Sequence, residues 1–499
     1  MILLEVVLGL YTLWLAADLL WRFFLGRRVI AEILAQQQQL LQIAAEATHI
    51  PQIQVILFLP MLGEQGNVAS LLQTIDSLVF PVDRLLVVPI TTERETAMQE
   101  QRQMAAQSVL QDLQAGYRGS RFVWKHSRIF ASRRLQTWVK TFATDSAAVR
   151  ADLAQLVEGL STRDVLKDVI EKGDFRARIE PIHYPETEGN KANQMNYALA
   201  VLQKAGLISE PTSTYIGVYD ADSRPCSLSL LALSVAANKK PAPAFQQYPI
   251  YLQDTNALDP FMRNEAWLQT ARSVCIEMPR QFKINAQLDC GSRWGTTFTY
   301  CIGHGEFLRA DWLLRSGFPE QTPIDDLPTG MMLSLAEQQI VPLPIFDFCS
   351  VPNSVFDFFR QSANWFEGQS DYISPYQRAK QFFTHTSPLR LFRGRFEQVI
   401  INLAWALTGP VRLLMILAAI SSGFWGMTLL LGIVLFAEVW SRWFITKLLL
   451  DSHLDCESLP RWPFPWFAIT RPILKSVGPC LYLLRKLVGS NAPWYKTER

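Results

Sequence analysis

The sequence has almost no net charge and no closely spaced pair of cysteines. Its 499 residues contain 47 Lys and Arg against 45 Asp and Glu, a net charge of +2 that does not favour nucleic acid as a partner. The seven cysteines form an odd number, and none belongs to a Cys-x-x-Cys pair. A disulfide framework and a zinc site are therefore disfavoured, and a reducing compartment such as the cytosol is indicated.

The N-terminal apolar stretch lacks two marks of a cleaved signal peptide. No basic residue precedes its apolar core, and no small-residue cleavage site follows it. We therefore predict a retained transmembrane helix over residues 1–28, followed by an amphipathic linker helix over 29–49. Arg27 and Arg28 follow the apolar core, so the positive-inside rule predicts an external N-terminus and a cytoplasmic domain after the helix.

Long apolar runs return in residues 391–499, the predicted C-terminal membrane region. Two runs, at about 399–421 and 424–449, are each long enough to cross a bilayer, and the short turn between them suits a helical hairpin. Pro410 predicts a kinked or partly interfacial start of the first run. The stretch 471–489 mixes basic with apolar residues, so we expect it to lie on the cytoplasmic surface. The prediction is a multi-pass protein of the cell (inner) membrane.

Residues 50–390 alternate apolar runs with helical patterns and form the predicted cytoplasmic domain. The runs "IQVILFLP", "DRLLVVPI" and "STYIGVYDADS" read as buried strands, and "VASLLQTIDSL" and "KANQMNYALAVLQKAG" have helical spacing. This order predicts an α/β fold with a mostly parallel sheet and helices on both faces. In such sheets, ligands bind at the carboxyl ends of the strands.

A helical insertion is predicted over about 95–172, between the second and third strands. It contains the segment "RGSRFVWKHSRIFASRRLQTWVK", in which basic residues alternate with aromatic ones. This composition suits an anionic membrane surface or a partner subunit, and a solvated helical face is equally compatible with it.

Two acids, Asp220 and Asp222, stand at the end of the run "YIGVYDADS". Side chains alternate between the faces of a strand, so acids two positions apart point the same way and can share one hard cation. The alternative is a turn at the strand exit, where Asp is common for local reasons. The rest of the sequence decides between these interpretations.

Further motifs follow in a fixed order. A glycine-rich turn in "YCIGHGEF" precedes a Gly-Phe-Pro, the paired acids Asp325 and Asp326, and then "FFRQSANWFEG". This order and spacing resemble the catalytic core of membrane-bound family 2 glycosyltransferases, the group of cellulose, chitin and hyaluronan synthases and ceramide glucosyltransferases. The resemblance covers roughly residues 50 to 370 with the flanking membrane helices, and the final "APWYKTER" also resembles tails of that group. It implies a GT-A type, Rossmann-like fold.

The resemblance implies roles for these acids. Asp220 would contact the nucleotide or the metal, Asp222 would hold the metal directly, and the cofactor would be Mg²⁺ or Mn²⁺. Asp326 would be the base that takes the proton of the acceptor hydroxyl. Asp325 stands where the family usually has Glu and would lie on the acceptor side, although an acid there also complements a helix dipole without chemistry.

The donor side is implied by the segment "PETEGNKANQMNYAL", which resembles the Gly-Lys-Ala segment of the family. Lys191 would supply a positive charge to the phosphates of a nucleotide-sugar, most simply a UDP-sugar. The acids that often follow the second strand in the family are replaced here by "VVPITTERE", so Thr91, Thr92 or Glu93 would contact the nucleotide, or the nucleotide is held differently. Glu64 is a further expected nucleotide contact.

The acceptor side is implied by two further segments. Gly303, His304 and Gly305 would form a turn that faces the acceptor. In "QSANW", Gln361 and Trp365 match the Gln-x-x-Arg-Trp motif of the family, and the tryptophan would stack on an acceptor sugar. The arginine of that motif is replaced by Asn364, which weakens the expectation of processive synthesis.

We therefore expect an inverting, metal-dependent glycosyltransferase that moves a sugar to a growing polysaccharide or lipid-linked acceptor at the cytoplasmic membrane face. Its partners would be the lipid bilayer, the acceptor, and export or regulatory subunits. Two alternatives are a non-processive lipid glycosyltransferase and a non-catalytic membrane scaffold of a glycan-export complex.

Overall fold

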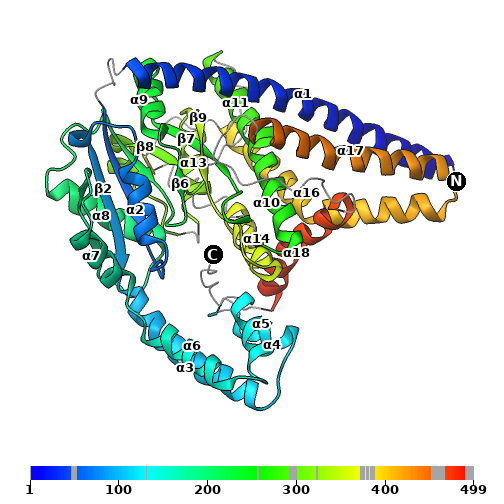
Figure 1. The fold of residues 1–499 in the computed structure, drawn as a ribbon. Coiled ribbons are helices and arrows are strands. Elements are labelled where there is room, and N and C mark those ends of the chain that lie inside the picture. Colours follow the sequence, from blue (N-terminus) through cyan, green and yellow to red (C-terminus); the bar gives the residue numbers. More distant parts are fainter. Residues whose placement is uncertain are drawn as a thin grey trace.

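A computed structural model describes residues 2–46, 53–127, 129–130, 132–255, 258–290, 301–321, 324–370, 377, 381–382, 388–450 and 467–488. The final "APWYKTER" lies outside these residues. The chain forms an α/β unit from which a long bundle of helices extends (Figure 1). Helix α1 (Ile2–Glu46) is a single helix of 45 residues. The expected membrane helix and linker helix are therefore one continuous element.

One sheet forms the centre of the α/β unit. Within the described residues it has nine strands in the order β3-β2-β1-β5-β8-β7-β9-β6, and β4 also pairs with β2. The strands are β1 (Gln54–Pro60), β2 (Leu85–Thr92), β3 (Arg178–Ile179), β4 (Ile182–Tyr184), β5 (Thr214–Val218), β6 (Arg224–Pro225), β7 (Ala244–Ile250), β8 (Glu306–Arg309) and β9 (Ile340–Phe348).

The sheet is mixed: among the described strands, five of the eight pairings are parallel, including that of β7 with β9, and three are antiparallel. The half that contains β1, β2 and β5 is parallel. Strand β8 then runs antiparallel to both of its neighbours, β5 and β7, and β6 runs antiparallel to β9. The antiparallel strand β8 has only four residues and pairs with distant segments, so its direction depends on long-range contacts rather than on local pattern.

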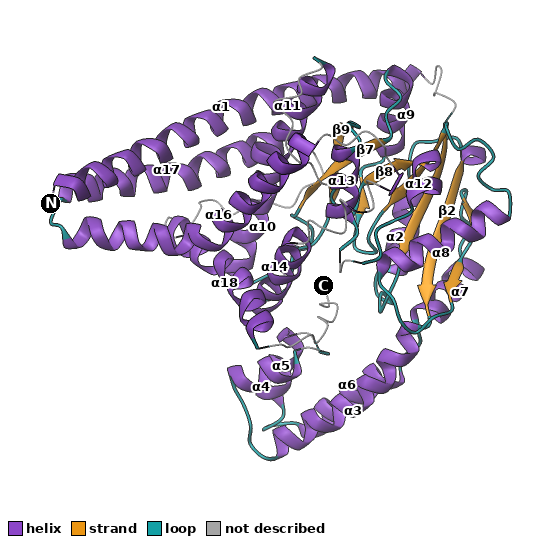
Figure 2. Cartoon of the chain, turned by 180° about the vertical axis from the view of Figure 1, so that it is seen from behind, coloured by secondary structure: helices purple, strands orange, loops and turns teal. Residues whose placement is uncertain are grey.

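Helices cover both faces of the sheet (Figure 2). The side chains of strand β1 alternate between two different cores: Leu57 packs on one side of the sheet and Phe58 on the other. Helices α2 (Val68–Asp76), α7 (Thr162–Lys172) and α9 (Ser229–Lys239) contribute to the first core, and α8 (Lys191–Lys204), α12 (Ala310–Ser316) and α13 (Asp326–Leu335) contribute to the second. This double burial explains the continuous apolar runs.

The segment after β2 forms a helical arm. Its helices are α3 (Arg94–Gln114), α4 (Ser120–His126), α5 (Ser132–Thr141) and α6 (Ser146–Glu158). The arm has its own small core, in which Trp138 packs edge-on against Phe130. At its tip, Trp124 lies against Phe356 of α14 (Val355–Ser370), and Ser127 accepts a hydrogen bond from Arg360 of the same helix. The arm thus joins the parallel half of the sheet, which it leaves after β2, to α14.

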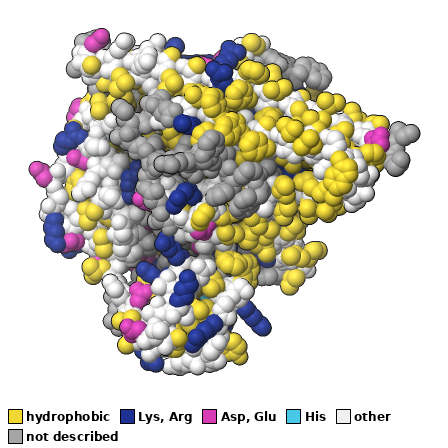
Figure 3. All heavy atoms as spheres, turned by 45° about the vertical axis from the view of Figure 1, so that its right-hand side comes forward, with side chains coloured by type: hydrophobic (Ala, Val, Ile, Leu, Met, Phe, Trp, Pro, Cys, Tyr) yellow, Lys and Arg dark blue, Asp and Glu magenta, His cyan; other side chains and the backbone are white. Residues whose placement is uncertain are grey.

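Among the described residues, three helices are long and apolar enough to cross a membrane: α1, α16 (Pro388–Ser421) and α17 (Trp425–Leu450). They include the three apolar runs that the sequence analysis identified. Exposed apolar side chains cover the far end of the bundle, on the right in Figure 3. The bundle also includes α10 (Pro260–Arg272), a π-helical turn η3 (Ser273–Glu277), α11 (Met278–Asp289) and α18 (Phe467–Leu487).

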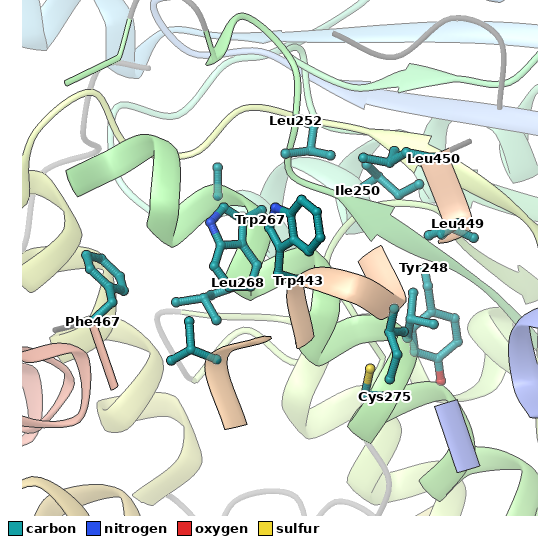
Figure 4. Close-up of a cluster of buried hydrophobic side chains, with 14 of the residues drawn as sticks. Tyr248, Ile250, Leu252, Trp267, Leu268, Cys275, Trp443, Leu449, Leu450 and Phe467 are labelled. Atoms are coloured by element: carbon teal, nitrogen blue, oxygen red, sulfur yellow. The ribbon is translucent and has the colours of Figure 1, made fainter. Parts of the chain in front are cut away.

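A shared apolar core joins the bundle to the sheet. Trp267 of α10 and Trp443 of α17 lie together in it, next to Ile250 at the end of β7 (Figure 4). Trp267 is fully buried, and its indole nitrogen donates a hydrogen bond to Asn264. Tight packing of such large side chains resists relative movement, so this core holds the bundle and the α/β unit together.

Candidate active site

The paired acids lie where β5 ends. Strand β5 stops at Val218, and the chain then turns through Asp220 and Asp222, with the amide of Ser223 donating to the carbonyl of Asp220. Asp222 is buried, whereas Asp220 is partly exposed. The strand-end placement expected from the sequence is therefore present in the structure.

Lys191 lies beside these acids at the start of α8. Its Nζ is 2.9 Å from Asp220 Oδ1 and donates to the carbonyl of Gly303 at 2.6 Å. Asn190 caps the helix and fixes its first turn. Although burial disfavours the ammonium, the carboxylates of Asp220 and Asp325 raise the pKa of Lys191 above its ordinary value. Lys191 is therefore a permanent positive charge in the site.

The glycine turn connects the two acidic segments. The Gly303 amide donates to Asp326 Oδ2 at 2.8 Å, while its carbonyl accepts from Lys191. Gly305 has φ +64°, and a Cβ there would lie 3.0 Å from the Gln247 carbonyl oxygen and Cβ, so the turn requires glycine at this position.

His304, the middle residue of the turn, is buried against Asp347 of β9. Its Nδ1 is 2.6 Å from Asp347 Oδ2. Burial disfavours the imidazolium, but this carboxylate outweighs burial and raises the pKa of His304 above its usual range. His304 thus has a structural partner, and it also borders the cavity that contains Asp220.

The second pair of acids opens α13. Asp326 accepts two backbone hydrogen bonds, from Gly303 and from Leu327, each at 2.8 Å. Burial, reinforced by the charge of Asp325, raises the pKa of Asp326 to about 6. Asp325 makes no side-chain cap to the helix, and its buried Oδ2 has no hydrogen-bond partner among the described residues. The two carboxylates therefore have different environments: Asp326 is held by backbone amides, whereas Asp325 has a buried oxygen without a hydrogen-bond partner among the described residues.

Helix α14 brings the expected acceptor residues to the same place. Gln361 and Trp365 are four positions apart, so they share a helix face, and both line the cavity. The Oε1 atom of Gln361 is buried without a hydrogen-bond partner in the described part of the chain. Such an atom is available to accept a hydroxyl donor from a ligand.

A cavity of about 340 Å³ unites these segments. The predicted residues that line it are Lys191, Asp220, Gly303, His304, Asp325, Asp326, Gln361 and Trp365. It also has polar lining residues that the sequence analysis did not identify: Glu265, Gln269, Arg272, Glu277, Arg471 and Lys475. Within α10 and η3, Glu265, Gln269, Arg272 and Ser273 recur at helical spacing and share one face of the helix, which is the sequence signal for this part of the cavity.

The expectation that the basic residues of α18 lie on the membrane surface is wrong for Arg471. Arg471 is buried and pairs with Glu265 at 2.7 and 2.9 Å, and Lys475, one turn later, faces the same cavity. The physical reason is close packing: α18 lies against α14 and α16, which turns this face of the helix inward.

Three proposed nucleotide residues do not line this cavity. Thr91 and Glu93 both contact His183 of β4, at 3.0 and 3.1 Å. Glu64 accepts from Asn67 at 2.9 Å and borders a separate cavity of about 720 Å³ between the sheet and the arm. His183, which lies in the short strand β4, was not identified from the sequence. Its hydrogen bond lowers the pKa of Glu93 below the usual range.

The acids that follow β5 fit a divalent cation that binds together with a diphosphate. In the described residues, no group of three or more His, Cys, Asp and Glu is arranged to hold a metal alone. Mg²⁺ is commonly held by one or two carboxylates, with substrate phosphates and water completing its shell. Asp220 supplies one hard oxygen ligand of that kind at the cavity. Asp222, two residues later in the same turn, is buried and is not among the residues that line the cavity.

No protein-family model and no curated protein matches the sequence. Among solved structures, the chain is similar to the mannosyltransferase PcManGT from Pyrobaculum calidifontis in complex with GDP-Man and Mn²⁺, with 12% identity over 95% of this chain and 99% of that one and a TM-score of 0.39. It is also similar to S. aureus TarS 1–349 in complex with UDP-GlcNAc, with 10% identity over 88% and 93% and a TM-score of 0.33. Similarities of this size carry no argument here.

Proposed function

We propose that the chain is an inverting, metal-dependent glycosyltransferase that moves a sugar from a nucleotide-sugar, of the UDP-sugar class, to an acceptor at the membrane. One observation carries the proposal. Lys191, Asp220, Asp326 and Trp365, which come from four distant segments, line one cavity that reaches the candidate membrane helix α16 and its neighbour α18.

The donor end of the cavity suits a departing diphosphate. Asp220 and Asp222 would hold a divalent cation, which would neutralise the charge that develops on the leaving group. Lys191 provides a fixed positive charge next to them, held by Asp220 and by the Gly303 carbonyl. An incoming phosphate oxygen would replace one of these two hydrogen-bond acceptors of Lys191 Nζ.

The base would be Asp326. An acceptor oxygen forms a bond to the anomeric carbon, the bond from that carbon to the phosphate oxygen breaks, and the hydroxyl proton passes to the Asp326 carboxylate. The nucleoside diphosphate leaves with the bonding electron pair. A carboxylate with a pKa of about 6 is ionised at neutral pH and is a stronger base than an ordinary aspartate.

A single transfer to a lipid acceptor is the second candidate. Asn364 replaces the charged residue that the polymerising relatives carry at this position in the family motif, and the cavity continues along α16 and α18. Both features favour one transfer at the bilayer surface over continuous synthesis.

The test is UDP release from a panel of UDP-sugars by the full chain in nanodiscs, with Mn²⁺ or Mg²⁺. Asp222→Ala should abolish metal-dependent UDP binding and turnover. Asp168→Ala, which removes an exposed acid paired with Lys172, is the matched control and should change neither. Equal metal-dependent UDP binding in wild type and Asp222→Ala would remove Asp222 from the site. Absence of both binding and release in the wild type would favour the scaffold alternative.

A further inference from the structure

The membrane-side end of the cavity contains a group of basic and acidic side chains that the transfer chemistry does not use. Arg272 and Glu277 come from α10 and η3, and Arg471 and Lys475 come from α18. Glu265 completes the group. Charged groups in such a location are costly unless they are paired or bind a ligand.

Four of these five groups form ion pairs. Arg471 binds Glu265 through two hydrogen bonds, and Arg272 lies 2.8 Å from Glu277. No carboxylate among the described residues forms an ion pair with Lys475. Its Nζ instead lies 5.4 Å from the centroid of the Trp405 ring. Lys475 is therefore the one basic side chain of this group that has no carboxylate partner among the described residues.

The position of Lys475 is fixed by backbone contacts on both sides of it. A Cβ on Gly409 of α16 would lie 2.4 Å from the Pro472 carbonyl oxygen, and a Cβ on Gly478 would lie 2.5 Å from Ser362 of α14. Trp405 also donates to the carbonyl of Lys475 at 3.1 Å. Glycine at these two sites lets α18 approach both helices closely, so Lys475 is held beside the segment that carries Gln361 and Trp365.

The ammonium is poorly compensated where it lies. Burial and the neighbouring Arg272 and Arg471 lower the pKa of Lys475 well below its ordinary value, against the opposing effect of Glu265 and Glu277. An anion next to Nζ would remove this penalty.

Unsatisfied acceptor atoms line the same cavity. Gln361 Oε1, Gln369 Oε1 and Asp325 Oδ2 are buried and have no hydrogen-bond partner among the described residues. Buried acceptors of this kind call for donors, and the hydroxyl groups of a ligand would provide them. The cavity therefore combines sites for hydroxyls with one site for an anion.

We propose that this cavity binds an acceptor with hydroxyl groups and a phosphate, and that Lys475 binds the phosphate while a hydroxyl faces Asp325 and Asp326. The anion site follows from the geometry of the cavity alone. The role of its ligand as the sugar acceptor rests on the proposed function. A phospholipid headgroup and a soluble polyol phosphate share this chemistry.

The test measures binding by the full chain in detergent micelles, without donor, using tryptophan fluorescence. The probes are dioctanoyl-phosphatidylglycerol, its neutral counterpart dioctanoylglycerol, and glycerol 3-phosphate. We expect Lys475→Met to weaken binding of the phosphatidylglycerol about 10- to 100-fold, the range for a lost hydrogen bond to a charged group. Lys475→Arg should retain most of the affinity.

The matched control is Lys447→Met. Lys447 lies 5.4 Å from the Trp443 ring, which reproduces the lysine–tryptophan contact outside the cavity, and its removal should leave binding unchanged. Tight binding of glycerol 3-phosphate that depends on Lys475 would support the anion site and assign the phosphate to a soluble acceptor. Equal affinities for phosphatidylglycerol and dioctanoylglycerol, or an unchanged affinity in folded Lys475→Met, would overturn the proposal.

Lys475→Gln serves as a second neutral variant if Lys475→Met does not fold, with size-exclusion chromatography as the check. Binding without donor also separates this proposal from the previous one. Phosphatidylglycerol binding that depends on Lys475, in a protein that never releases UDP, would refute sugar transfer and leave the anion site intact.

Discussion

Replacing Asp326 by Asn separates the proposed base from its neighbour Asp325. The change removes the ionisable group but keeps its shape, so turnover should fall by about two to four orders of magnitude, the usual scale for loss of a general base. Affinity for UDP and metal should barely change, because Lys191, Asp220 and Asp222 meet the donor charge.

The structure adds a stability cost to this prediction. Both carboxylate oxygens of Asp326 accept backbone hydrogen bonds, and an amide nitrogen can accept neither of them. One N–H group, of Gly303 or Leu327, loses its acceptor at a cost of about 1–3 kcal/mol. The melting temperature should therefore fall measurably while the chain stays folded.

Asp325→Asn is the matched comparison. Its Oδ2 has no partner among the described residues, and its side chain does not cap α13, so the amide should leave stability nearly unchanged and reduce acceptor affinity. Both variants would be assayed for UDP release, UDP binding and melting temperature. An inactive Asp325→Asn with an active Asp326→Asn would show that the roles are reversed, and normal turnover in both would place the base elsewhere.

Three further predictions follow from the same geometry. The kcat/KM of the wild type should fall about tenfold per pH unit below pH 6, because protonation of Asp326 removes the base and its pKa is raised to about 6; a rate that stays flat down to pH 4.5 would contradict this. Gly305→Ala should destabilise the chain by at least about 1–2 kcal/mol, since φ is +64° and the new Cβ would press on Gln247; an unchanged denaturant midpoint would refute the argument. With Cys290 as the only cysteine, a membrane-impermeant maleimide should label it in inverted vesicles and not in intact cells, because this exposed residue belongs to the predicted cytoplasmic domain; the opposite pattern would reverse the topology.

The parts of the structure that the sequence predicted are those specified by local pattern. Strand β5 ends in an acid pair because a buried run must stop where polar residues begin, and α14 presents Gln361 and Trp365 together because helix geometry requires it. The α/β class follows in the same way from the alternation of runs.

The remaining features depend on contacts between distant segments. The direction of β8 is set by β5 and β7, and the inward orientation of Arg471 is set by close packing on α14 and α16. Thr91 and Glu93 contact His183 because β4 pairs with β2, an arrangement that no local motif encodes.

The unbroken α1 sets the height of the active site above the bilayer. A helix of 45 residues is about 68 Å long, whereas a bilayer core of about 30 Å requires about 20 residues. The remaining residues extend from the membrane to the sheet, where Leu40 packs against Leu231 of α9 and Ile345 of β9. Because α1 is continuous from Ile2 to Glu46 and packs directly on the α/β unit, the helix would hold the sheet at a set distance from the bilayer, and a substrate would have to cover that distance itself.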